Sequence, residues 1–329
     1  MSAAIGKLRA HCEKPALQTE QVRKGAAPPL YELRGRRPLP DLFRFLQPRY
    51  VHTQLDMKRS FFSVLHKLQL TRLAAWWNRK RVVILCYHGV TERSERHPSD
   101  RHGLHIRADR FEAHLDYLRR HYKVISLEDF LNARSNNAPL PDRAVVLTFD
   151  DGYRNFLTSA APRLAARGFP VSLFLITDKI QPDGGPKPIN WSETDDETFL
   201  SWQEVQALRE QGVELGSHTC SHRKLSYLAT ADAQHELRAS YEAMQMHLSQ
   251  PAMPLAFPFG SYSDAVIAMA RQLPYTCALT TDAGTNGPAT DLFLLRRNLI
   301  GDDDDEAAFV ARVSGLTAAL QRVVAPFRN

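Results

Sequence analysis

Short apolar runs alternate with longer amphipathic segments from residue 81 onward. The run at 81–87 places Val82, Val83, Ile84 and Leu85 in succession, as expected of a strand that is buried on both faces. Strand and helix patterns that alternate in this way are typical of parallel β/α units. The predicted strands are 81–87, 144–149, 171–176, 213–215, 255–257, 277–280 and 294–299, and the predicted helices are 111–121, 159–167, 202–211, 230–248, 263–273 and 306–323.

Residues 81–329 are therefore expected to form one α/β domain, a distorted (β/α) barrel, behind a basic N-terminal extension. A chain of 329 residues is long enough to bury a sizeable core. The pattern indicates the fold class but leaves the closure of the barrel open.

The first 80 residues carry the positive charge of the chain. They contain 16 Lys or Arg against 5 Asp or Glu, out of 42 and 36 in the whole chain, so the remainder is mildly acidic. Residues 1–56 are rich in Pro, Arg and Gln and are predicted to be a disordered extension. A new pattern starts at Met57, and translation from Met57 rather than Met1 is an alternative.

The segment 57–80 is predicted to be a basic amphipathic helix. Phe61, Leu65, Leu68 and Trp76 fall near one helical face, and Lys and Arg residues add positive charge. Such a helix either caps the domain that follows it or lies on an anionic membrane surface.

Composition argues against several classes of protein. No apolar run reaches the roughly 18 to 20 residues of a transmembrane helix, and no secretory signal is recognised, so a cytoplasmic or peripheral membrane location is expected. Cys12, Cys86, Cys220 and Cys277 are too scattered for a disulfide scaffold or a four-cysteine zinc site. The chain also lacks zinc-finger spacings and aromatic-interleaved RNA motifs, so no nucleic-acid partner is expected despite the net charge of +6.

Two strand ends carry residues suited to metal binding, and reactive groups of a β/α barrel lie at such ends. The second predicted strand is followed by Asp150 and Asp151, whose charges repel unless a cation or proton lies between them. The fourth runs out into His218 and His222, and two imidazoles four residues apart can face one divalent ion. Two His and one carboxylate leave an open position for water, and the other carboxylate can then act as a base.

Other interpretations of these residues are open. One Asp could cap the next helix, which would explain one carboxylate but not both. Cys220 could be a soft metal ligand, although its spacing favours a small packed residue. His88, at the end of the first strand, is either a hydrogen-bonded structural residue or a general acid, because His titrates near neutrality.

The stretch 257–262 follows another predicted strand. It forms a rigid turn, an aromatic wall for a sugar ring, or both. The candidate substrate-binding residues are Phe257, Pro258, Phe259, Gly260 and Tyr262.

Together these motifs resemble the polysaccharide deacetylase family, also known as the NodB-homology or carbohydrate esterase family 4 proteins. The sequence at 148–152 looks like the family's first motif and that at 217–222 like its second, and the resemblance runs from about residue 82 to residue 297. It implies a metal-dependent barrel enzyme that removes acetyl groups, above all N-acetyl groups, from a glycan or glycolipid. The implied cofactor is one divalent ion, zinc first, with cobalt or nickel as alternatives.

Carried over by motif, the resemblance implies Asp150 as the general base and Asp151, His218 and His222 as metal ligands. One departure is Ala256, which stands where family members commonly carry Arg.

A second departure is that no His follows His247, so the usual late histidine motif is missing. In a branch with rearranged motifs, similar to enzymes that act on bacterial exopolysaccharide glucosamine, the acid comes from the first strand, which here implies His88. The late arginine that orients the base would be Arg297, with Arg296 as the competing assignment.

Competing functions use the same barrel. A sugar O-acetyl esterase or another sugar deacylase would need the same site, because it attacks any small acyl carbonyl. A non-catalytic carbohydrate-binding protein would have lost a ligand or the base, whereas all four positions are filled here. A membrane-docked scaffold would depend on the segment 58–80 rather than on the barrel.

Overall fold

The computed structural model describes residues 61–95, 100, 103–183 and 198–324, with side chains to residue 320. The chain divides into two units, Met1–Pro48 and Arg49–Asn329, and all described residues belong to the second. The predicted disordered extension at 1–56 lies outside the described residues.

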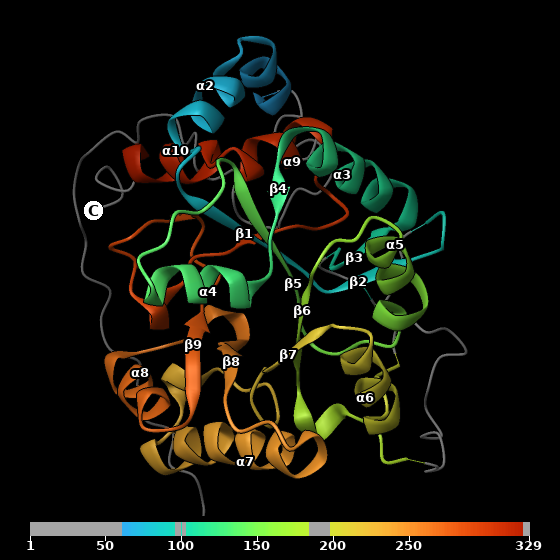
Figure 1. The fold of residues 1–329 in the computed structure, drawn as a ribbon, viewed down its shortest axis with the longest axis vertical. Helices are drawn as coiled ribbons and strands as arrows, with labels where there is room; N and C mark the ends of the chain where they lie inside the picture. Colours follow the sequence, from blue (N-terminus) through green and yellow to red (C-terminus); the bar gives the residue numbers. More distant parts are fainter. Residues whose placement is uncertain (1–60, 96–99, 101–102, 184–197, 325–329) are drawn as a thin grey trace, which may run out of the picture. The chain divides into compact units, whose positions relative to one another are not determined.

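A curled, mainly parallel sheet forms the centre of this unit (Figure 1), which confirms the predicted α/β class. The strand order is β10-β1-β5-β6-β7-β8-β9, and all neighbours from β1 to β9 run parallel. The strands are β1 (Val82–Tyr87), β2 (Gly89–Thr91), β3 (His105–Arg107), β4 (Lys123–Val124), β5 (Ala144–Phe149), β6 (Ser172–Leu175), β7 (Glu214–Ser217), β8 (Met253–Ala256), β9 (Tyr275–Leu279), β10 (Thr285–Asn286) and β11 (Asn298–Leu299).

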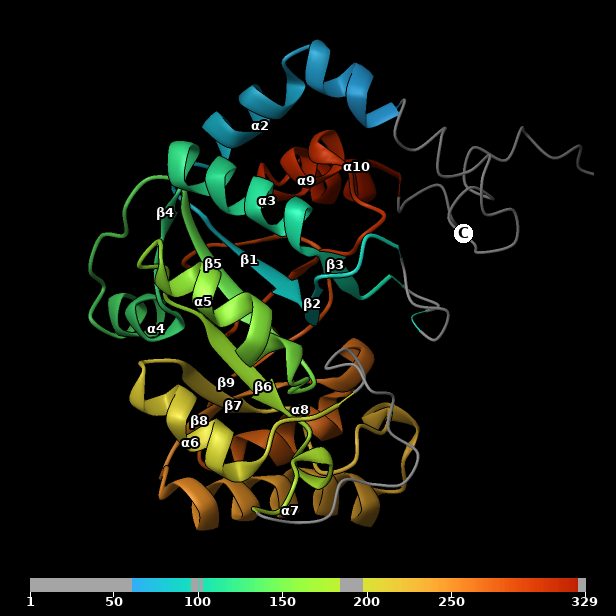
Figure 2. The same cartoon turned by 90° about the vertical axis from the view of Figure 1, so that its right-hand side faces the viewer.

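Helices cover the outside of the sheet on several sides (Figure 2). Some of them start at side-chain caps that the sequence supplies: Ser201 and Glu204, for instance, form a capping box at the start of α6. The described helices are α2 (Leu70–Trp77), α3 (Ala108–His121), α4 (Leu127–Ser135), α5 (Ala161–Ala165), α6 (Trp202–Glu210), α7 (Thr230–Leu248), α8 (Asp264–Arg271), α9 (Glu306–Val313) and α10 (Leu316–Val324), with a π-helical turn at Phe156–Ala160 and 3-10 turns at Thr177–Lys179, Leu225–Tyr227, Pro258–Gly260 and Leu292–Leu294.

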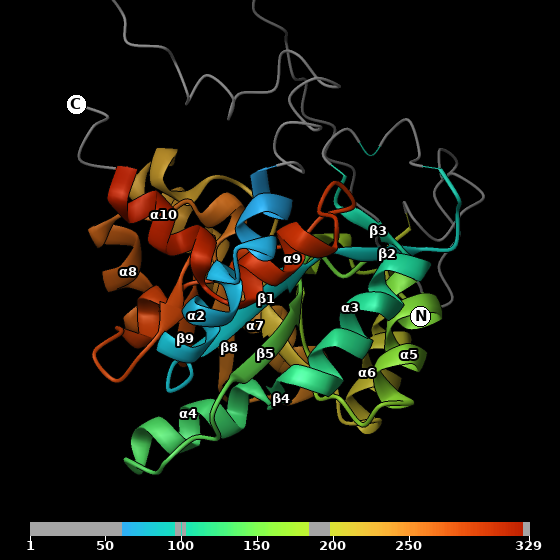
Figure 3. The same ribbon diagram turned by 90° about the horizontal axis from the view of Figure 1, so that it is seen from above.

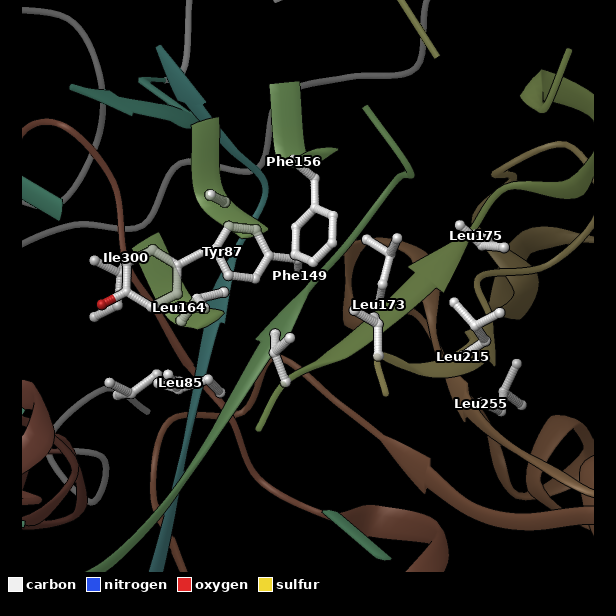
Figure 4. Close-up of a cluster of buried hydrophobic side chains, with 14 of the residues drawn as sticks. Leu85, Tyr87, Phe149, Phe156, Leu164, Leu173, Leu175, Leu215, Leu255 and Ile300 are labelled. Atoms are coloured by element: carbon white, nitrogen blue, oxygen red, sulfur yellow. The ribbon is translucent and has the colours of Figure 1, made fainter. Parts of the chain in front are cut away.

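The strands divide their side chains between two apolar clusters. In β1, Val83, Leu85 and Tyr87 belong to a large cluster shared with the surrounding helices (Figure 4). Val82 and Ile84 belong to a smaller cluster, whose other members come from β5, β6, β8 and β9, from Leu295, and from the start of α4 and the residues just before it. Because side chains alternate along a strand, the second set lines the interior of the barrel.

A short segment spans the gap between β9 and β1. Leu295 forms a parallel bridge with Leu279 of β9, and three residues later Asn298 pairs with Leu85 of β1. The strand predicted at 294–299 is therefore replaced by a turn and the two-residue strand β11. This irregular segment joins the two edges of the sheet, which the apolar pattern could not indicate.

The helix predicted at 57–80 is broken in the structure. Residues 61–67 are helical, α2 follows at 70–77, and Gln69 between them has a left-handed φ of 61°. In Figure 3, α2 lies against α9 and α10. Among the described residues, no helix combines the length and the apolar character needed to cross a membrane.

Candidate active site

The candidate site lies where β1, β5 and β7 end. These strands are close neighbours in one parallel sheet, so their carboxyl ends meet at one edge. His88 follows β1, Asp150 and Asp151 follow β5, and His218 follows β7. The structure therefore brings together residues that are 130 positions apart in the chain, as the motifs predict.

Asp151, His218 and His222 form a compact cluster of possible metal ligands. Their ligand atoms all lie within 4.8 Å of one another. The Nε2 atoms of both histidines lie 3.5 Å from Oδ1 of Asp151, and that oxygen is buried without a hydrogen-bond partner. Two imidazoles and one unsatisfied carboxylate oxygen at these separations fit a divalent cation.

The surrounding backbone fixes the direction of these ligands. Nδ1 of His218 lies 2.8 Å from the carbonyl oxygen of Ala256, and a proton donated there leaves Nε2 free to bind a metal. Asp151 and His222 both have left-handed backbones, with φ of 77° and 63°. Such strain persists only where the fold holds it and is frequent at functional sites.

A buried carboxylate holds the loop that carries the histidines. Glu236 of α7 accepts hydrogen bonds from the backbone N and the hydroxyl of Ser221. Cys220 in the same loop lies 3.1 Å from a carboxylate oxygen of Asp178, and burial raises the pKa of its thiol to about 12. Cys220 is thus a packed thiol, and the alternative of a cysteine ligand is not favoured.

The two adjacent aspartates differ sharply in their ionisation. Burial, and then the charge of Asp150, raises the pKa of Asp151 to about 8. Burial acts in the same direction on Asp150, but the guanidinium of Arg297 outweighs it and holds the pKa of Asp150 below its usual range. Asp150 is therefore anionic, whereas Asp151 requires a cation or a proton beside it.

Arg297 forms a bidentate pair with Asp150 inside the barrel. Its Nη1 and Nη2 atoms lie 2.6 Å and 2.8 Å from the two carboxylate oxygens, and its Nε donates to the carbonyl of Thr280 at 2.9 Å. Both partners are almost completely buried. Arg296 forms no such contact, because its side chain passes Gly284 instead. The geometry thus separates the two arginines that the sequence left as alternatives.

His88 lies at the same edge of the sheet. Its Nδ1 is buried and has no hydrogen-bond partner, and burial lowers its pKa to about 4. The expectation that His88 titrates near neutrality is therefore wrong, because its imidazole is neutral at pH 7.

The aromatic stretch at 257–262 only partly matches its predicted role. Phe257 is 0% exposed and Pro258 is also buried, so the prediction of these two side chains as a sugar-facing surface is corrected: they pack into the core. Phe259 is 59% exposed and its ring lies 4.5 Å from that of His222. Gly260 has a φ of 64°, and the hydroxyl of Tyr262 donates to Asp282 at 2.6 Å. Phe259 and Tyr262 are left as candidates for substrate contact.

Sequence reasoning missed Cys86 as part of this site. Its Sγ lies 3.4 Å from Oδ2 of Asp150, in the completely buried interior. Strand alternation supplied the signal, because Cys86 follows Val82 and Ile84 on the inner face of β1 and pairs in register with Thr148, two residues before Asp150.

Comparisons with known proteins agree with this geometry. The family model described as polysaccharide deacetylase matches residues 137–278, which include both metal-ligand motifs. Over these residues the chain is similar to polysaccharide deacetylases. This finding confirms the family resemblance and the type of barrel predicted from the motifs.

Individual relatives of the chain are distant. YxkH of Bacillus subtilis, which carries the family's name, is 22% identical over 72% of this chain and 77% of its own length. Poly-beta-1,6-N-acetyl-D-glucosamine N-deacetylase of Escherichia coli K12 is 25% identical over 72% of this chain, but the match covers 39% of that longer relative. The solved structure of the Streptococcus pyogenes deacetylase PplD in complex with acetate has the same fold, with a TM-score of 0.60 and 23% identity over 71% of this chain and 98% of that one.

Proposed function

We propose that this protein is a metal-dependent hydrolase that removes N-acetyl groups from a glycan or glycolipid. One observation carries the proposal: a possible two-histidine, one-aspartate metal cluster lies directly beside a separate buried aspartate that is paired with arginine. A hydrolytic metal site needs this combination of ligands and base. The family match to polysaccharide deacetylases supports the same reaction class.

Asp151, His218 and His222 are the residues that would hold the ion. When bound there, a divalent metal supplies positive charge that polarises the acyl carbonyl and makes water more acidic. Zinc fits a His/His/carboxylate set best, and cobalt or nickel would fit it also.

The residues of the chain then divide the proton transfers between them. Asp150 accepts a proton from the attacking water, while Arg297 fixes both carboxylate oxygens and so sets the direction of the base. As the carbon–nitrogen bond breaks, the leaving nitrogen needs a proton. We assign its delivery to His88, which is neutral in the free site because its pKa is about 4. The proton that His88 delivers is the one that Asp150 has accepted from water, so the two residues relay it to the leaving nitrogen. The products are acetate and a free amine.

The substrate class follows from relatives and from the exposed aromatic side chain at the site. The Escherichia coli relative is named for a β-1,6-linked N-acetylglucosamine polymer, and a similar N-acetylated glycan is proposed here. Phe259, exposed beside His222, offers an apolar face on which a sugar ring can pack.

The test combines metal content with acetate release from N-acetylglucosamine oligomers. The wild type is expected to bind one metal ion per chain and to release acetate. His218→Ala should lose both, whereas His235→Ala, which changes an exposed histidine on α7, should lose neither. Asp150→Asn should keep the metal and lose about 10²–10⁴-fold in turnover, and Asp264→Asn at an exposed position serves as its control.

Other outcomes would redirect the proposal. Full turnover in Asp150→Asn would exclude this residue as the base. Metal binding with acetate release only from O-acetylated sugars would assign an esterase. Absence of metal binding by the wild type after reconstitution would instead support a carbohydrate-binding protein.

A further inference from the structure

An exposed apolar surface covers the helices before β1. Trp77 is 77% exposed, Leu68 64% and Leu73 60%. Together with four more exposed apolar side chains they form what we call the N-terminal helical face. Its members are Phe61, Val64, Leu68, Leu70, Leu73, Trp76 and Trp77.

These side chains do not serve the packing of the helices on the domain. Leu65 and Thr71 are the buried positions of this segment, and α2 contacts α9 and α10. Trp77, Leu68 and Leu73 of the N-terminal helical face therefore project mainly into solvent. Seven large apolar side chains exposed within residues 61–77 exceed the scattered single residues of an ordinary surface and mark an interaction surface.

A basic pocket lies between α2 and α3, and its lining residues Thr71, Arg72 and Ala75 alternate along α2 with the exposed apolar side chains. It has a volume of about 480 Å³ and is lined by Arg72, Arg120 and Arg143, with Glu306 as a single acid. None of the three arginines forms an ion pair with a carboxylate within the described ranges. Burial and these three arginines together lower the pKa of the neighbouring His121. The pocket is thus a site of concentrated positive charge.

We propose that the N-terminal helical face and the basic pocket dock the protein on an anionic phospholipid surface. Trp and Leu side chains would enter the boundary between headgroups and acyl chains, and the arginines would pair with lipid phosphates. The combination favours a membrane over a second copy of the chain, because a symmetric dimer would bring the same arginines together and their positive charges would repel one another.

Docking in this way leaves the active site facing the water. α2 leads into the amino end of β1, whereas His88 follows its carboxyl end, about 20 Å further along the strand. A glycan that extends from the membrane or lies in solution could then reach the metal cluster without passing the lipid surface.

The test is flotation of the full-length protein with vesicles. The protein should bind vesicles of phosphatidylcholine with about one third phosphatidylglycerol, and bind pure phosphatidylcholine vesicles at least about tenfold more weakly. Leu73→Ser/Trp77→Ser should lower partitioning to the anionic vesicles about tenfold or more. Arg72→Gln should lower it about fivefold.

Met246→Ser is the matched control, because Met246 is 72% exposed on α7, and it should leave vesicle binding unchanged. Acetate release from soluble oligomers should be unaffected in all these variants. The proposal is overturned if the protein does not float with anionic vesicles, if neutral vesicles bind equally well, or if the double variant binds like wild type. A dimer in solution that Leu73→Ser/Trp77→Ser dissociates, without vesicle binding, would assign the face to a second copy instead.

Discussion

Charged side chains near the two ends of β1 lie in opposite environments. Beyond its carboxyl end, Asp150 and Arg297 are buried and paired with each other through two short hydrogen bonds. Near its amino end, Arg72 and Arg120 are exposed and form no ion pair within the described part of the chain, beside apolar side chains that are also exposed.

This difference shows that burial decides whether a charged side chain needs a partner within the protein. In the barrel interior the cost of removing a charge from water is large, so every charge must be compensated by a partner. At the surface water screens the arginines, and they are available for an external anion. The interior end is therefore expected to be sensitive to single substitutions, and the surface end tolerant of them.

Of the variants considered, Arg297→Met should lower the stability of the protein most. It leaves the carboxylate of Asp150 buried without its partner, and such changes cost about 3–5 kcal/mol in the free energy of unfolding. Urea unfolding of the variant and of Asp150→Asn/Arg297→Met measures this. The double variant should recover part of the loss because the unpaired charge is gone. A double variant as unstable as the sum of both single variants would contradict this account.

Asp151 should make the metal-free protein less stable as the pH rises. Its pKa is raised to about 8, so between about pH 4 and pH 8 the folded state keeps a proton that the unfolded state has lost, and stability falls through this window and levels off above it. Asp150, with its lowered pKa, contributes its stability above its unfolded pKa and loses it only at lower pH.

Thermal unfolding in a chelator, with and without added zinc, measures this effect. Zinc replaces the proton, so the gain in Tm should be larger at pH 8 than at pH 5, and Asp151→Asn should flatten the metal-free profile. An equal gain at both pH values would show that Asp151 does not carry the pH dependence.

Cys86→Ala should produce a smaller effect at the same end. It removes a weak donor 3.4 Å from Oδ2 of Asp150, and we expect a loss of about 1 kcal/mol in stability and a modest fall in kcat. Cys277→Ala is the matched control, because this thiol is equally buried in the interior cluster but no carboxylate contact is found for it among the described residues. Cys86→Ser should retain most of the activity. Equal falls in kcat for the two alanine variants would reduce Cys86 to a packing residue.

The candidate residues of this site could be found in the sequence because their motifs are local. Asp150 and Asp151 adjoin one strand and His218 and His222 follow another, so each motif could be found without knowing the tertiary structure. The identity of the arginine could not be decided, since Arg296 and Arg297 differ only in which way the irregular segment at 295–299 turns them. Cys86 was missed because it looks like any buried strand residue until the register with β5 is known.

Some elements of the fold were predicted correctly and others were not. Long apolar runs such as those of β1 and β5 gave correct strands, because burial on both faces leaves a continuous pattern. The segment 57–80 was predicted as one helix rather than two pieces, because amphipathic periodicity carries through Leu68 and Gln69, where the backbone leaves the helix. Phe257 was assigned to the substrate because it is aromatic, but aromatic character does not indicate whether the residue after β8 points into the core or into the site.

Leu73→Ser/Trp77→Ser should have the smallest effect on the isolated protein. Both side chains are largely exposed, so their loss removes little packing, and stability should change by no more than about 0.5 kcal/mol. Acetate release from small soluble oligomers should stay at the wild-type level, because the site lies beyond the other end of β1. Urea unfolding and a soluble-substrate assay check both points. A loss of several kcal/mol would mean that these side chains are packed in solution. The N-terminal helical face would then not be a surface available to a membrane, and the contrast with the paired charges of the interior would not hold.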